Sequence, residues 1–65
     1  MRVHLVVREM VQDDGIKFPL ILQGYRSARA AGSRVLRENA RIELFAAAQK
    51  VGCVIVNRVV QVEVS

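Results

Sequence analysis

Hydrophobic residues follow two kinds of pattern along this chain. Over residues 2–12 they alternate with polar residues, which is typical of a β-strand with one buried face. Two further β-rich runs cover residues 16–23 and 53–64. Between them, residues 27–51 carry apolar residues at helical spacing. The order β-β-α-β predicts one small α+β domain over residues 1–65, a three-stranded antiparallel sheet with one long helix packed on one face.

The first two runs form a predicted hairpin around residues 14–15, Asp-Gly. A two-residue loop sets Val11 opposite Phe18. A shift of one residue would instead set Arg8 opposite Leu20 and bury a charge. We therefore expect the first register, with the apolar face of residues 2–12 (Val3, Leu5, Val7 and Val11) turned toward the core.

Pro19 determines the expected order of the strands. A proline cannot donate a ladder hydrogen bond, so residues 16–23 should lie at an edge and the order should be 2-1-3. The run 53–64 is longer than either hairpin strand, and residues 57–58 are a candidate bulge or bend that divides it. If it is continuous, its C-terminal end extends past the hairpin as an open apolar edge, which favours pairing with another chain.

The predicted helix begins after Ser27 as N-cap and closes at Gly52, with residues 32–33 (Gly-Ser) as a weak point. It carries two apolar stripes, and packing on one sheet needs only one of them. The second is half exposed, or another part of this chain covers it, or another copy covers it, or its alanines simply favour helix. Because the rest of the chain forms one predicted sheet, another copy is the preferred answer. The stripe expected on the sheet comprises Leu36, Ala40, Leu44, Ala47 and Val51, and the second comprises Ala28, Ala31, Val35, Ile42 and Ala46 with Phe45 at its edge.

Length and composition strengthen the case for association. A chain of 65 residues lies near the lower limit for burying a sufficient core alone, and 52% of its residues are hydrophobic. The single cysteine excludes an internal disulfide, and the single histidine makes a His/Cys metal site within one chain improbable. We therefore expect a homodimer or higher oligomer without metal or cofactor. The residues expected to mediate self-association are Val35, Ile42, Phe45, Val60, Val62 and Val64.

Catalysis is not expected. Cys53 and His4 form the only nucleophile–base pair of note. In the antiparallel arrangement His4 lies beside residues 61–63, some distance from Cys53. We therefore expect a buried, hydrophobic Cys53 and a surface His4. With neither a signal peptide nor an apolar run near 18 residues, the chain is expected to be cytoplasmic and not bound to a membrane.

The positive charge is concentrated in one segment. Five arginines and one glutamate between residues 26 and 41 account for the whole net charge of +4, because the other five cations and five acids cancel. Guanidinium groups suit phosphate oxygens, and a dimer would double the surface. The alternatives are a solvated face neutralised by Glu38, or contact with an acidic protein. The candidate anion-binding residues are Arg26, Arg29, Arg34, Arg37 and Arg41.

Together these features predict a small basic, non-enzymatic binding protein that contacts nucleic-acid phosphates. The alternative is a protein–protein interaction or regulatory module, or a structural self-assembling subunit. Either alternative would use the sheet edge and the second apolar stripe of the helix.

Overall fold

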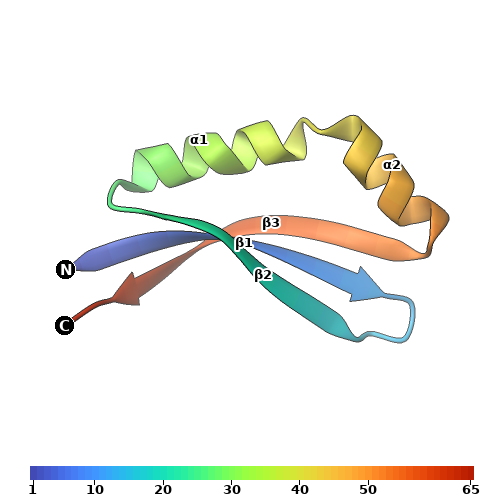
Figure 1. Cartoon of the computed structure of the whole chain (residues 1–65), viewed down its shortest axis with the longest axis horizontal. Helices are drawn as coiled ribbons and strands as arrows, with labels where there is room; N and C mark the ends of the chain where they lie inside the picture. Colours follow the sequence, from blue (N-terminus) through green and yellow to red (C-terminus); the bar gives the residue numbers. More distant parts are fainter.

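The computed structural model describes residues 1–65 as three strands and two helices (Figure 1). They follow the order β1 (Arg2–Gln12), β2 (Lys17–Tyr25), α1 (Ala28–Asn39), α2 (Ile42–Lys50) and β3 (Cys53–Glu63). The strands form one antiparallel sheet in the order β2-β1-β3. The predicted α+β class and strand order are therefore confirmed, and Pro19 lies on an edge strand.

The prediction of one long helix over residues 27–51 is wrong, because the helix breaks at Ala40 and Arg41. The amides of these two residues donate to carbonyls three residues back, those of Arg37 and Glu38, at 3.2 Å. Such bonds tighten the last turn and satisfy carbonyls that a helix end leaves free. The chain then bends, and α2 slopes toward the start of β3 (Figure 1).

The predicted ends of the helical segment are confirmed. The Ser27 hydroxyl accepts the amide of Ala30 at 3.3 Å and caps α1, which continues without interruption through residues 32–33. Gly52 follows α2 with φ of 74°, in the left-handed region that favours glycine. A Cβ atom at residue 52 would lie 2.6 Å from a carboxylate oxygen of Asp13, so the turn after α2 lies against the β1–β2 loop.

The hairpin register next to the loop differs by one residue from the prediction. Arg8 lies opposite Leu20, the pairing that was expected to be excluded. The loop has three residues, 13–15, and its glycine has φ of 83°. A shift between Val6 and Val7 marks a bulge, after which the start of β1 returns to the predicted register.

The last strand is continuous. Residues 53–63 pair with β1 along its whole length, so there is neither a break at residues 57–58 nor an overhanging end. The Met1 amino group donates to the Val64 carbonyl at 2.9 Å, and the Val64 amide donates to the Met1 carbonyl at 2.7 Å. Both termini therefore lie at the same end of the sheet (Figure 1). The outer sides of β2 and β3 are the two edges that remain unpaired.

The helices cover the face of the sheet opposite to the one predicted. Residues buried on the covered face are His4, Val6, Arg8, Ile55 and Asn57. The residues predicted to form the core face point away from the helices. We call this uncovered side the open face. Its apolar members are Val3, Leu5, Val7, Val11, Pro19, Ile21, Val54, Val56, Val60 and Val62.

The packed stripe of α1 also differs from the prediction. Ala31 and Glu38 of α1 are buried against the sheet, whereas Leu36, expected at the centre of the packed stripe, is 72% exposed. Val51 from that stripe is 75% exposed. In α1 the second stripe therefore packs on the sheet, but its α2 member Ile42 is 78% exposed.

The molecule is flat, with principal extents of 40 × 23 × 10 Å. Its accessible surface of 4752 Å² exceeds the value of about 4,200 Å² expected for a compact chain of this mass. Only Val6, Val7, Ala31 and Ile55 are buried apolar residues. Neither helix has the length and apolar character needed to cross a bilayer. Most of the apolar residues of this chain are therefore at least partly exposed to solvent.

Candidate functional site

A cluster of charged side chains lies between α1 and the sheet, with Glu38 at its centre. Its carboxylate accepts from the Arg34 Nε at 3.0 Å, from the Arg41 Nη1 at 3.1 Å, and from the Arg8 Nη2. The three arginines come from different places: β1, the middle of α1, and the residue that joins the two helices. The break after α1 therefore helps to place one of the three guanidinium groups. We call Arg8, Arg34, Glu38 and Arg41 the arginine cluster.

Further polar contacts connect this cluster to the sheet. The Arg8 Nε donates to the Asn57 side-chain oxygen at 3.0 Å, and the Asn57 amide group donates to Asn39 at 2.9 Å. Arg34 also donates to the Gln23 side chain at 2.9 Å and to the Tyr25 hydroxyl at 3.3 Å. Burying Arg8 is tolerated because its charge and its donors have partners on both neighbouring layers.

The hydrogen bonds to three cations strongly favour the charged form of Glu38. Those from Arg41 and Arg8 contribute most, and they lower the pKa of Glu38 from 4.5 to about 2. The pKa of Arg34 is raised, first by its hydrogen bond with Tyr25 and then by that with Glu38. One negative charge faces three positive charges, so the cluster carries an excess of two positive charges.

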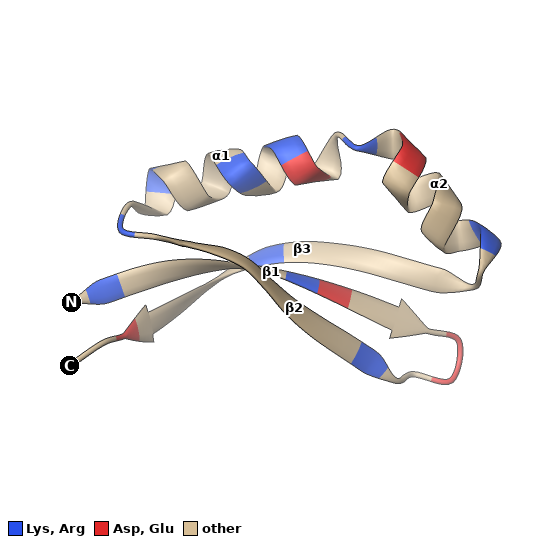
Figure 2. Cartoon of the chain, viewed as in Figure 1, with Lys and Arg blue, Asp and Glu red and all other residues tan.

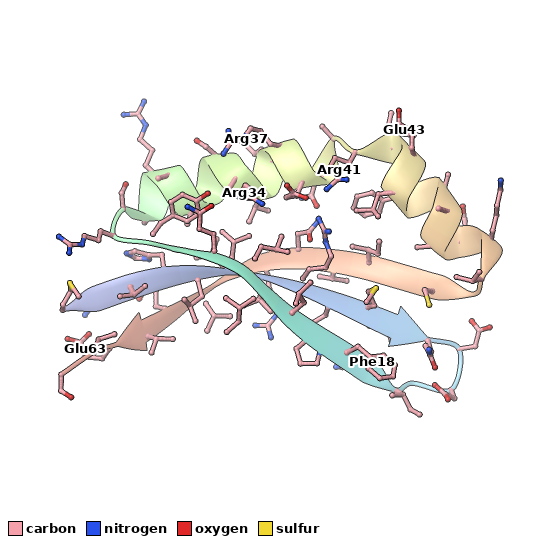
Figure 3. All side chains as sticks on the ribbon, viewed as in Figure 1. Phe18, Arg34, Arg37, Arg41, Glu43 and Glu63 are labelled. Carbon is pink, nitrogen blue, oxygen red and sulfur yellow. The ribbon has the colours of Figure 1, made fainter.

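The five predicted anion-binding arginines fall into two groups. Arg34 and Arg41 lie on the side of α1 toward the sheet and pair with Glu38, while Arg37 lies on the outer side (Figure 3). Arg26, Arg29 and Arg37 are exposed and have no hydrogen-bond partner. Arg34, Arg37, Glu38 and Arg41 line a shallow hollow in the surface. Lys and Arg positions recur along α1 and the loop before it (Figure 2).

The structure also separates the residues predicted to mediate self-association. Val35 and Phe45 are half-buried, and Phe45 lies beside residues 53–55 of β3. Ile42 is 78% exposed. Val60 and Val62 lie on the open face, and Val64 follows beyond the end of β3, exposed and bonded to Met1. The six residues therefore do not form one continuous surface.

His4 and Cys53 lie at opposite ends of the sheet, as predicted. His4 pairs with Gln61 and Cys53 pairs with Gln12, which separates them by about 26 Å at roughly 3.3 Å per strand residue. The expectation of a surface His4 is wrong, because it is buried on the covered face and its Nδ1 has no hydrogen-bond partner. Cys53 is half-buried and free.

Sequence reasoning missed Arg8 and Asn57 as members of the site. Both lie in strands, where a charged or amide side chain is normally assigned to the face that is exposed to solvent. Glu38 was the signal that could have identified them, because it is the only acid among five arginines. A single carboxylate in such a segment attracts the cations near it, including cations from other elements. Glu38 lies four residues after Arg34 and three before Arg41, spacings at which helical side chains meet, and both contacts are present in the structure.

The low pKa of Glu38 predicts acid sensitivity. A group whose pKa is lower in the folded state stabilises the fold above its unfolded pKa and loses that contribution as the pH falls. For Glu38 the loss should occur between about pH 4.5 and pH 2. We expect the Tm to fall through this window, and Glu38→Gln should show a flatter profile. Thermal unfolding monitored by circular dichroism across pH measures this, and a Glu38→Gln slope equal to the wild-type slope would contradict it.

Comparison of the chain with known proteins finds no matching family, no similar curated protein and no similar solved structure.

Proposed function

We propose that the protein is a non-catalytic binding protein that contacts nucleic-acid phosphates through the arginine surface of α1. The observation that supports this most is the excess of guanidinium groups over carboxylates around Glu38, next to the unpaired Arg37. A phosphate placed in this hollow would meet charged donors that are already held in position. Arginine suits this role, because it offers several donors and keeps its charge.

The unpaired arginines extend this surface along the helix. Arg29 and Arg37 are about two helical turns apart, and Arg26 lies in the loop before α1. Eight residues at 1.5 Å each separate Arg29 from Arg37 by about 12 Å along the helix axis. One DNA strand carries a phosphate about every 3.4 Å of its axis, so this length matches between three and four phosphates. Tyr25, the only tyrosine, is half-buried, and its hydroxyl donates to Gln23 and accepts from Arg34. A single half-buried ring does not make a platform on which successive bases stack. Backbone contact with a duplex is therefore the mode of binding that we propose.

An electrophoretic mobility shift with mixed-sequence duplex DNA across a salt series tests this proposal. We expect micromolar binding at low salt that weakens steadily as salt rises. The double variant Arg29→Gln/Arg37→Gln should weaken binding by about tenfold per arginine at roughly 100 mM salt and reduce the salt slope by about two. Neither residue has a hydrogen-bond partner in the fold, so stability should be unaffected.

A matched control has the same change in net charge at other sites. Lys17→Gln/Lys50→Gln also removes two exposed cations, one from β2 and one from the end of α2. It should retain most of the binding. Equal losses in both double variants would show that net charge alone attracts the DNA, and no shift at low salt would dismiss the proposal.

A specific observation supports a second candidate, a protein-interaction module. Leu36 and Ile42 are 72% and 78% exposed on the two helices, and such side chains suit an apolar contact with a different protein. An Ile42→Asp variant should then lose a stoichiometric partner in affinity purification while duplex binding persists. Recovery of that partner by the variant would dismiss this candidate.

A further inference from the structure

The open face of the sheet is a continuous apolar surface with no layer over it. Row by row across the strands it carries Val62 beside Val3, Val60 beside Leu5, and Val54 beside Val11, with Ile21 next to Val7 near the middle. Ile21 is 61% exposed and Val54 is 63% exposed. Antiparallel sheets commonly leave one face to solvent, but that face is then mostly polar. This sheet has a mostly apolar open face, interrupted by Glu9 and Arg58, and it buries Arg8 on the covered face.

The charges on the open face are few, and two of them neutralise each other. The Arg58 Nε donates to Glu9 at 2.7 Å, and the two groups occupy neighbouring rows of the face. The remaining charge, Lys17, lies at the end of the edge strand β2 and reaches solvent. An approaching surface therefore does not need to bring an opposite charge. An uncharged apolar surface therefore fits against this face.

The face is large enough to hold two copies together. Strands of 11 residues span about 37 Å, and three strands at roughly 4.8 Å are about 14 Å wide, giving a footprint of about 500 Å² per copy. Two such faces bury about 1,000 Å² if each is treated as flat, which is the lower limit for a specific interface. Side chains that project from the sheets add to this buried area. The chain itself buries only four apolar residues. Covering this face supplies the core that a single copy lacks.

We infer that two copies of this chain pack their open faces together, forming a four-layer assembly with the two sheets inside and the helices outside. The occupant is a second copy because two such apolar faces reach the area that a specific interface needs, and because a single copy buries only four apolar residues. The arginine surface of α1 lies on the other side of the sheet, so it stays exposed in the dimer. The inference is independent of nucleic-acid binding.

Paired substitutions on β2 test this inference. Ile21→Glu places a carboxylate on the open face, whereas Leu20→Glu places one on the covered face at a site that is also exposed, by 52%. Sedimentation equilibrium should give the wild type twice the 7.3 kDa chain mass. Ile21→Glu should weaken dimerisation by at least about a hundredfold, because two carboxylates per dimer lose water. Leu20→Glu should leave it within about threefold, in the range of a surface substitution.

Three outcomes of this test would overturn the inference. They are a wild-type monomer at high micromolar concentration, equal losses in both variants, and a dimer that persists in Ile21→Glu. The last would place the interface at the outer edge of β3 or on the helices. Circular dichroism should show that both variants keep the fold.

A distance measurement keeps the inference testable if Ile21→Glu fails to fold. Ser33 is exposed on α1, so Ser33→Cys in a Cys53→Ala background accepts one nitroxide label per chain. Sheets packed about 10 Å apart with a helix layer outside each put the two labels roughly 40 Å apart. Double electron–electron resonance showing that separation supports the inference. A separation below roughly 20 Å would mean that the helices form the interface, and it would overturn the inference.

Discussion

Replacing Glu38 with glutamine should lower the Tm by more than about 10 °C. This is the largest effect that we expect from any single replacement by an uncharged residue in this chain. The side chain keeps nearly its size but loses its charge, and Arg8, Arg34 and Arg41 then converge on a neutral amide. The Arg8 side chain is only 11% exposed and retains only Asn57 as a partner, so its charge recovers little hydration. Scanning calorimetry at neutral pH measures the change.

Glu43→Gln is the matched control. Glu43 is also a helical glutamate, but it lies exposed in the first turn of α2 and has no hydrogen-bond partner. Its substitution should change the Tm by no more than about 3 °C. If Glu38→Gln were equally mild, the arginine cluster would be a solvated surface network and not a determinant of the fold.

Truncation of Val6 should produce the second large loss of stability. Val6 has no exposed surface and lies on the covered face of the central strand, under α1. Val6→Ala removes two methyl groups and leaves a cavity, which together cost about 2 to 3 kcal/mol. A domain of this length has roughly 3 to 10 kcal/mol to lose. Urea unfolding at a fixed protein concentration should show the lower midpoint.

Val51→Ala provides the comparison for that truncation. Val51 is 75% exposed at the end of α2, so the same change in composition should alter the free energy of unfolding by no more than about 0.5 kcal/mol. A similar loss at both positions would mean that Val6 does not form part of a packed core.

The order of the strands was predictable because it depends on local properties of single residues. Pro19 cannot pair on both sides, Ser27 caps a helix, and Gly52 adopts a positive φ. These constraints act through backbone geometry and need no knowledge of distant contacts. Each of them is found in the structure.

The choice of face was not predictable by the same reasoning. Alternation divided β1 into an apolar side and a polar side, and the cost of burying Arg8 decided the assignment. That cost assumes a charge without partners. In the structure, Arg8 contacts Glu38 of α1, thirty residues away in sequence, and Asn57 of β3. These contacts form only in the tertiary structure, and they offset the cost of burying the Arg8 charge. The same assumption produced the wrong hairpin register, in which Arg8 was kept away from Leu20.

The break between the helices lacked any usual sequence signal. Neither glycine nor proline occurs at residues 40–41, and the one glycine–serine pair of the segment lies in regular helix. A straight helix from residue 28 to residue 50 would continue in the direction of α1. The break turns α2 so that Phe45 reaches β3. Tertiary packing overrides local propensity at this point.

The close approach of Gly52 to Asp13 affects how these two surface loops can change over evolutionary time. Loops normally diverge independently, because each makes few contacts outside itself. Here a side chain gained at residue 52 would occupy the space of the Asp13 carboxylate and would also require a backbone angle that L-amino acids disfavour. Divergent copies of this gene should therefore keep glycine at 52, and any exception should carry a smaller residue at 13.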